Sequence, residues 1–371
     1  MNAALKFLPH EHLKAWLEEL AGTMRVLAPQ KEGAAVVYRA FDPSREPELI
    51  RKPTESAKHI LFPRSEALFA FHKKKAPFAP DSLNPDGSQA EKEEPATPAM
   101  ELTPPEQPGP TVVFGMTGCD AGGVTTFDPV YGGRYQDPYY LQRREATVLI
   151  ARACNEALST CFCTWVGGDP ANRRDADILA TRLENGWLLE PLTERAERVL
   201  GSTLLGDAGE AEAREAEALH AKARAAIGEA PDLTGIEDAL PALFDDKDFW
   251  WSESAACLAC GACTYLCPTC HCFTITDEKA GLSGVRLRAW DTCMAALYTL
   301  EASGHNPRGQ KAARLRNRVG HKFAYFLKNH QGRISCCGCG RCIKSCPSSV
   351  DIRRIVLNAL KRAKGKEAAN G

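Results

Sequence analysis

Two stretches of the chain carry cysteines at the same spacing. They read Cys257-x2-Cys260-x2-Cys263-x3-Cys267-Pro268 and Cys336-x2-Cys339-x2-Cys342-x3-Cys346-Pro347. Three cysteines spaced by two residues can share one tight loop and occupy three corners of a tetrahedron, whereas the fourth cysteine begins the next segment and points elsewhere. Such runs are typical of proteins that hold [4Fe–4S] clusters, which take four thiolates each.

The fourth cysteine of each run decides how the two runs share their ligands. In ferredoxins that hold two clusters, this cysteine ligates the cluster of the other run. Applied to this chain, the arrangement gives one ligand set of Cys257, Cys260, Cys263 and Cys346, and another of Cys336, Cys339, Cys342 and Cys267. We therefore expect two [4Fe–4S] clusters held by eight ferredoxin-type cysteines.

Zinc is the main alternative for cysteines of this kind, and a zinc site typically uses two Cys-x2-Cys pairs. Two complete runs of four cysteines, each followed by proline, favour iron–sulfur clusters instead. Gly261, Gly338 and Gly340 lie within the runs and suit loops whose amides approach inorganic sulfide closely. Cys337 belongs to neither ligand set, and we interpret it as a small buried thiol.

Four more cysteines lie in the N-terminal half of the chain. They are Cys119, Cys154, Cys161 and Cys163. Cys-x-Cys is a permissible ligand spacing, so this set could bind a third [4Fe–4S] cluster or zinc. Buried thiols without any metal are the alternative, and the spacing does not decide between the two interpretations.

Three cysteines remain outside these sets: Cys270, Cys272 and Cys293. The first two directly follow the first run. Three thiols do not complete a tetrahedral ligand set, so packing beside a cluster is the simplest interpretation. An exchange of ligands with the N-terminal cysteines stays open.

Basic residues dominate the chain between the two runs. From residue 286 to residue 333, only Asp291 and Glu301 oppose a larger set of cations: Arg286, Arg288, Arg308, Lys311, Arg314, Arg316, Arg318, Lys322, Lys328 and Arg333. A solvated face is the simplest interpretation, and a docking face for an acidic partner or positive charge that offsets anionic clusters are the alternatives. Nucleic-acid binding is disfavoured because aromatic residues are not interleaved as stacking platforms.

The number of cysteines also bears on the cellular compartment. Disulfide scaffolds are short secreted domains, whereas this chain has 371 residues, 16 of them cysteine, and is 44% apolar. Its first residues lead into an amphipathic helix and not into the apolar run of a signal peptide. No apolar stretch approaches the ~18 residues of a membrane helix. We therefore expect reduced thiols and a cytoplasmic protein without membrane insertion, and the net charge of −1 gives no sign of nucleic-acid binding.

The pattern of apolar residues predicts both helices and strands. Helices are expected over residues 10–22, 142–158, 170–183 and 208–228, and strands over residues 26–28, 35–38, 111–115 and 186–189. From residue 249 onward strand signals fade, and a helical pattern separates the two cysteine loops. The predicted fold is α+β, with an N-terminal α/β domain followed by a mainly helical two-cluster ferredoxin-like domain.

Composition predicts the domain boundaries. Residues 76–110 are rich in Pro, Glu, Ser and Gly and can bury little apolar surface, so we expect a flexible insertion there. The N-terminal domain would then comprise residues 1–75 and 111–247, and the ferredoxin-like domain residues 248–371.

Further segments make the chain resemble a known family. They are Leu61-Phe62-Pro63-Arg64-Ser65-Glu66, Phe114-Gly115-Met116-Thr117-Gly118-Cys119-Asp120, Asp137-Pro138-Tyr139-Tyr140, Thr160-Cys161-Phe162-Cys163, Trp290-Asp291-Thr292-Cys293 and Asn306-Pro307-Arg308. Together with the two cysteine runs, they resemble the beta subunit of cytoplasmic NiFe sulfhydrogenases and the related iron–sulfur subunit of anaerobic sulfite reductase. The resemblance extends over roughly residues 10–75 and 111–360.

The resemblance implies an electron-transfer subunit of a hetero-oligomeric oxidoreductase that has no catalytic residues of its own. Its partners would be an FAD-binding subunit that oxidises NAD(P)H, or a similar donor, and a terminal redox enzyme. That enzyme could be a hydrogenase, a sulfite reductase or a heterodisulfide-reductase-like module. A stand-alone flavin-dependent iron–sulfur oxidoreductase is the main alternative, although no Gly-x-Gly-x-x-Gly phosphate loop occurs in the sequence. A zinc-stabilised binding protein is a third hypothesis.

Overall fold

The computed structural model describes residues 4–74, 100–106 and 108–370, with side chains up to residue 365. Most of the predicted insertion at residues 76–110 lies outside the described residues. The chain forms two compact units, of which unit 1 comprises Met1–Phe62, Pro108–Cys272 and Asp291–Gly371, and unit 2 comprises Pro63–Gln107 and Phe273–Trp290. The predicted boundary between residues 247 and 248 falls within unit 1, and the predicted division into domains stays a prediction. The described residues contain helices and sheets, which confirms the α+β class.

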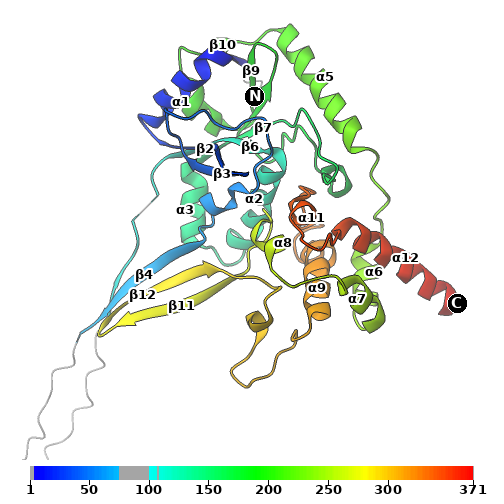
Figure 1. Cartoon of the computed structure of the whole chain (residues 1–371). Helices are drawn as coiled ribbons and strands as arrows, with labels where there is room; N and C mark the ends of the chain where they lie inside the picture. The colour runs from blue at the N-terminus through cyan, green and yellow to red at the C-terminus, as the bar shows by residue number, and fades with distance from the viewer. Residues whose placement is uncertain (1–3, 75–99, 107, 371) are drawn as a thin grey trace, which may run out of the picture. The chain divides into compact units, whose positions relative to one another are not determined.

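Unit 1 contains an eight-stranded sheet of mixed direction (Figure 1). Its strands are β1 (Lys6–Pro9), β2 (Arg25–Glu32), β3 (Ala35–Ala40), β6 (Thr111–Thr117), β7 (Thr147–Arg152), β8 (Ile178–Arg182), β9 (Gly186–Pro191) and β10 (Gly206–Asp207). They follow the order β10-β1-β9-β8-β7-β6-β2-β3. The neighbours β2, β6, β7 and β8 run parallel, whereas the outer pairs are antiparallel. The predicted strands at residues 26–28, 35–38, 111–115 and 186–189 all fall in this sheet.

Helices cover the sheet of unit 1 because its central strands are apolar along their whole length. All residues of β6 are buried. Val112 and Phe114 of β6 pack with Trp16 and Leu17 in one core cluster. The helices and short helical turns here are η1 (His10–His12), α1 (Leu13–Ala21), η2 (Ala57–Ile60), α2 (Gly118–Tyr131), α3 (Pro138–Ala146), η3 (Cys163–Val166), η4 (Glu194–Ala196), α4 (Glu197–Leu200) and α5 (Glu210–Ile227).

Two of the predicted helices are wrong in large part. The helix predicted over residues 142–158 ends with α3 at Ala146, and β7 follows at once. The helix predicted over residues 170–183 is a loop that leads into β8. Both errors fall on parallel strands buried on both faces, whose continuous apolar runs lack the period of two that marks a half-buried strand. The helices predicted over residues 10–22 and 208–228 are confirmed as η1 with α1 and as α5.

The rest of unit 1 is mainly helical. Its elements are α6 (Ile236–Ala242), α7 (Lys247–Ser254), α8 (Ala262–Tyr265), η5 (Ala296–Thr299), α9 (Lys311–Gly320), the π-helical turn η6 (His321–Tyr325), α10 (Phe326–Asn329), α11 (Arg341–Lys344) and α12 (Ile352–Asn370). Helix α6 packs against α12, and α7 packs against α9. Leu240, Trp250, Leu315, Phe323 and Ile355 belong to one buried cluster that joins these helices. Among the described helices, none is long and apolar enough to cross a membrane.

Unit 2 is a four-stranded antiparallel sheet (Figure 1). It consists of β4 (Ser65–Lys73), β5 (Met100–Thr103), β11 (Phe273–Ala280) and β12 (Ser283–Trp290), in the order β11-β12-β4-β5. Buried Arg288 pairs with buried Glu66 across β12 and β4, with an N–O distance of 2.7 Å. The expectation that strands fade after residue 249 is therefore wrong at β11 and β12. Most side chains of β11 are exposed and polar, so this strand lacks the apolar alternation that would have revealed it.

Candidate iron–sulfur centres

The first run of cysteines forms a loop between α7 and α8. Ala259 and Gly261 have φ values of 54° and 78°, so the backbone turns twice within the run. Gly261 precedes α8, which carries Cys263, and Cys257 lies in the loop before it. Because Gly261 adopts a left-handed conformation that glycine tolerates without strain, the loop can fold back tightly on itself.

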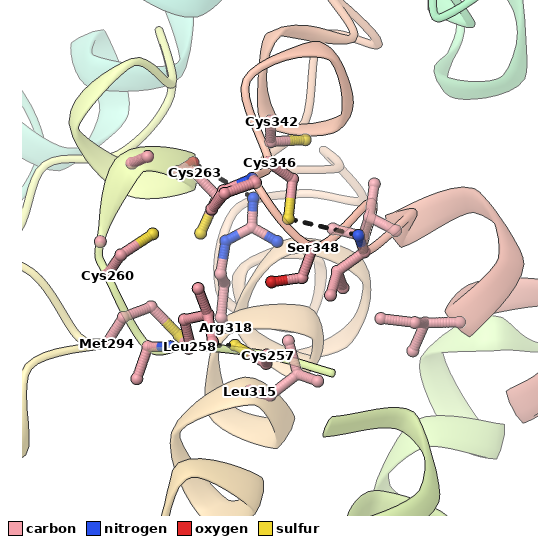
Figure 2. Close-up of a pocket in the computed structure, with 17 residues that line it drawn as sticks. Cys257, Leu258, Cys260, Cys263, Met294, Leu315, Arg318, Cys342, Cys346 and Ser348 are labelled. Carbon is pink, nitrogen blue, oxygen red and sulfur yellow. Dashed lines mark hydrogen bonds between the residues drawn. The ribbon is translucent and has the colours of Figure 1, made fainter. Parts of the chain in front are cut away.

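Four cysteines of the predicted first ligand set line one cavity, which we call the first site. They are Cys257, Cys260, Cys263 and Cys346. Figure 2 shows their sulfur atoms disposed around the guanidinium group of Arg318. Backbone amides contact two of these sulfurs, with Ala259 N 3.4 Å from Cys257 Sγ and Val350 N 3.2 Å from Cys346 Sγ. The cavity thus combines three cysteines of the first run with the fourth cysteine of the second run.

The other four cysteines line a neighbouring cavity, the second site. They are Cys267, Cys336, Cys339 and Cys342. Cys342 lines both cavities, and α8 packs against α11. Because each fourth cysteine follows one of these two short helices, packing of α8 against α11 carries it across to the opposite site. The structure therefore brings together the two crossed sets that the ferredoxin pattern predicts.

Two buried cations lie at these sites, and their surroundings fit anionic clusters. Arg318 and Lys322 are 4% and 2% exposed. In the described part of the chain, neither has a carboxylate partner, and Arg318 donates to the carbonyl of Cys263. A buried charge without an opposite charge is costly. Thiolate-ligated clusters carry net negative charge, so their presence would compensate both cations.

The thiols of the second site have unequal proton affinities. The hydrogen bond from Cys337 is the main reason that the pKa of Cys339 falls to about 6. The pKa of Cys267 is lowered by a hydrogen bond from the Cys270 thiol and by the positive charge of Lys322, against the opposite effect of burial. Burial raises the pKa of Cys336 to about 12. Because the thiolate is the form that ligates metal, Cys267 and Cys339 are prepared for ligation even before iron is bound.

The N-terminal cysteines lie near one another and beside the second run. Burial, followed by the charges of Cys119, Cys154 and Cys161, raises the pKa of Cys163 to about 12. The Lys52 ammonium donates to Cys161 Sγ at 3.5 Å and to the backbone carbonyl of Cys339 at 2.6 Å. Cys119 and Cys163 also line a polar cavity of about 480 Å³ that reaches Cys336 and Cys337. The structure thus gathers this predicted set around a lysine, next to the second site.

Two glycines of the second run serve the packing between these regions. The Gly338 carbonyl accepts a hydrogen bond of 2.9 Å from the amide of Phe162. A methyl group at Gly338 would collide with the backbone of Phe162 and Cys163, and one at Gly340 with the backbone of Thr160. Glycine is required here because two backbones meet, which adds to the expected approach to inorganic sulfide.

A buried ion pair also joins α2 to the second run. Arg341 on α11 donates to both carboxylate oxygens of Asp120 on α2, at 2.6 and 2.8 Å. Tyr38 and Thr117 donate to the same carboxylate, at 3.3 and 3.0 Å. Bidentate arginine–carboxylate pairs fix orientation as well as distance. The pair therefore positions α11, which carries Cys342.

The three remaining cysteines pack close to the second site, in line with the simplest interpretation of the sequence. The Cys270 thiol donates its hydrogen bond to Cys267, a ligand of that site. Cys272 accepts a hydrogen bond from Cys293, which is the main reason that the pKa of Cys272 falls to about 6. Cys293 is buried.

Sequence reasoning missed several of these cations or misread their surroundings. The basic stretch was expected to form a solvated face, yet Arg314, Arg318 and Lys322 are buried. Arg314 caps the carbonyls of residues 308 and 309. Charge that offsets the clusters, the alternative weighed from the sequence, describes Arg318 and Lys322 better. Lys52 belongs to no motif, so no sequence signal could have assigned it to the site.

Comparison with known proteins agrees with this geometry. Residues 256–350 match the family described as 4Fe-4S dicluster domain. Over 257 residues the chain is 30% identical to "Sulfhydrogenase 2 subunit beta" of Pyrococcus furiosus, which covers 68% of this chain and 74% of that protein. No solved structure matches the chain. The resemblance inferred from the sequence is thereby confirmed: the chain belongs to the sulfhydrogenase beta subunit family, whose members are iron–sulfur electron-transfer subunits with a 4Fe-4S dicluster domain.

Proposed function

We propose that this chain relays single electrons between a donor subunit that oxidises NAD(P)H through a flavin and a terminal redox enzyme. The observation that carries the proposal is the pair of adjacent cavities, each lined by three cysteines of one run and the fourth cysteine of the other. Both cavities adjoin Arg318 and Cys342, so the two sites are close neighbours within one helical core. A relay needs such proximity and needs no substrate pocket.

The ligands follow from the lining of the cavities. We assign one [4Fe–4S] cluster to Cys257, Cys260, Cys263 and Cys346, and the other to Cys336, Cys339, Cys342 and Cys267. When bound, the clusters supply one-electron redox chemistry. The chain holds them by thiolates, compensates their charge with Arg318 and Lys322, and excludes solvent from the second site more than from the first.

A third [4Fe–4S] cluster on Cys119, Cys154, Cys161 and Cys163 extends this proposal. The mutual electrostatic influence of these thiols and the Lys52 ammonium at Cys161 support it. Lys52 also contacts Cys339 of the second site, so a third cluster would continue the relay from that side. Exposed Cys260 marks the opposite end, at the first site.

Two partners are proposed. One is a flavin-containing subunit that oxidises NAD(P)H, and the other is a catalytic redox enzyme such as a hydrogenase, a sulfite reductase or a heterodisulfide-reductase-like module. The relative from Pyrococcus furiosus is named as a beta subunit of a sulfhydrogenase, which supports assembly into a hetero-oligomer. Free thiols throughout the described residues support a reducing compartment, for which we propose the cytoplasm.

Chemical analysis of the anaerobically purified chain tests the number and nature of the centres. About eight irons with matching acid-labile sulfide per chain supports two clusters, and about twelve supports three. Bound flavin on the isolated chain would favour a stand-alone oxidoreductase instead. Zinc without sulfide would replace the proposal with a zinc-stabilised binding protein.

The variant Cys260→Ala tests the relay itself. It is expected to lose about four irons and to stop electron flow through the assembled complex, because the first site loses an exposed ligand. Leu258→Ala is the matched control, since Leu258 lies in the same loop, is 68% exposed and supplies no sulfur. Unchanged turnover with the natural donor in Cys260→Ala would contradict the relay.

A further inference from the structure

One buried side chain treats the two sites unequally. The ammonium of Lys322 lies 3.4 Å from Cys267 Sγ, 2.7 Å from Thr269 Oγ1 and 2.9 Å from the carbonyl oxygen of Ser335. Thr269 Oγ1 is itself 3.2 Å from Cys267 Sγ. Lys322, Thr269 and Ser335 are 2%, 1% and 0% exposed. A complete positive charge is therefore held, away from solvent, against a ligand of the second site.

The equivalent cysteine of the first site has no such neighbour in the described residues. Cys346 Sγ accepts a hydrogen bond from the uncharged backbone amide of Val350, at 3.2 Å. Arg318 lines both cavities, so its charge acts on both sites. The fourth ligands of the two runs, Cys267 and Cys346, thus differ by the charge and the hydroxyl group that contact Cys267 alone.

We propose that Lys322 is a positioning residue that raises the reduction potential of the second site above that of the first, so that electrons settle at the second site. The proposal rests on the proposed function, because it requires a [4Fe–4S] cluster in each site. In the step concerned, one electron leaves the first site and one electron enters the second, and no bond forms or breaks.

The physical reason is the extra negative charge of the reduced state. Hydrogen bonds to the ligand sulfurs, net charge and solvent access set the potential of an iron–sulfur cluster. The buried ammonium stabilises the added electron with little screening by salt or solvent. Solvent contact at exposed Cys260 acts in the opposite direction, by favouring reduction at the first site. The ammonium prevails because a complete charge at hydrogen-bonding distance outweighs partial hydration of one sulfur among four.

Redox titration of the whole chain, followed by electron paramagnetic resonance, tests the proposal. Cys260→Ala removes the first centre and so assigns each signal to its site. In the wild type, the signal of the second site is expected to appear at the higher potential. Lys322→Met should lower the ratio of reduced to oxidised centres at the second site about tenfold at a fixed potential, which corresponds to about 59 mV. The first site should change much less.

Two controls separate charge from structure. Lys322→Arg keeps the positive charge and should keep the potential. Lys328→Met removes a charge from an exposed lysine that pairs with Asp238, and should leave both potentials unchanged. An unaltered second-site potential in a Lys322→Met protein with full iron content would overturn the proposal.

If Lys322→Met loses iron, the order of the two potentials in the wild type decides, because a higher first site contradicts the proposal by itself. The proposed function fails in a different way, namely when the wild-type chain holds no pair of reducible iron–sulfur centres.

Discussion

The ion pair between Asp120 and Arg341 gives the sharpest prediction about stability. Its side chains are 1% and 4% exposed, and two hydrogen bonds of 2.6 and 2.8 Å join them. Asp120→Asn preserves the shape of the side chain but removes its charge. The variant leaves the guanidinium of Arg341 buried without a counter-charge, and one amide NH2 group faces donors where the carboxylate accepted hydrogen bonds.

The size of the effect follows from this geometry. Breaking a buried pair by removing one partner typically costs about 3–5 kcal/mol, because the remaining charge stays desolvated. Each lost hydrogen bond to a charged group accounts for about 1.5–3 kcal/mol, which agrees with two bonds lost or weakened. Since a folded domain is stable by only about 5–15 kcal/mol, Asp120→Asn is expected to remove a large fraction of the stability of unit 1.

Urea-induced unfolding of the anaerobic protein, followed by tryptophan fluorescence, measures this loss. Glu145→Gln is the matched control, because Glu145 also meets two arginines, Arg195 and Arg198, but is 64% exposed. The control should stay within about 1 kcal/mol of the wild type. The double variant Asp120→Leu with Arg341→Met should recover much of the loss, since no unpaired charge remains buried. A cost below about 1 kcal/mol for Asp120→Asn would refute the reasoning.

Three further predictions concern the ligands, the histidines and the glycines. Cys346→Ala should remove the cluster of the first site and spare that of the second; iron analysis with spectroscopy checks this, and loss of the second-site signal instead would contradict the crossed assignment. Burial lowers the pKa of His271 to about 3 and of His321 to about 4, below about 6.5 in the unfolded chain. Stability should therefore be complete above pH ~6.5 and fall as the pH drops towards ~4, and His271→Phe should flatten the slope by up to about 1.4 kcal/mol per pH unit in urea titrations; an unchanged slope would speak against it. Gly340→Ala should destabilise more than Gly167→Ala, since both glycines have φ of 73° but only the first packs against backbone; equal shifts in the thermal midpoint would exclude this packing argument.

The cysteine pattern was the part of the site that sequence could predict in detail. The spacing within each run describes one loop and one short helix, so the ligands on it are local in sequence. The crossed position of Cys346 came from the ferredoxin pattern, and packing of α8 against α11 provides its physical basis. Apolar periodicity likewise located α1 and β6, because each buries a continuous face.

The remainder depends on partners that lie far apart in sequence. Lys52 and Lys322 are unremarkable lysines until the fold places their ammonium groups against Cys161 and Cys267. The direction of a charged side chain in the basic stretch depends on anionic clusters, which the sequence represents only through their ligands. The strands β7 and β8 were mistaken for helices for a related reason: burial on both faces, a tertiary property, erases the local period.

Electron paramagnetic resonance of the reduced, anaerobic chain tests the central claim most directly. Two crossed sets of four thiolates predict at least about two unpaired spins per chain from reduced [4Fe–4S] centres, and about three if the N-terminal cysteines hold a cluster as well. A colourless protein that gives no such signal after reduction and contains no acid-labile sulfide would contradict it.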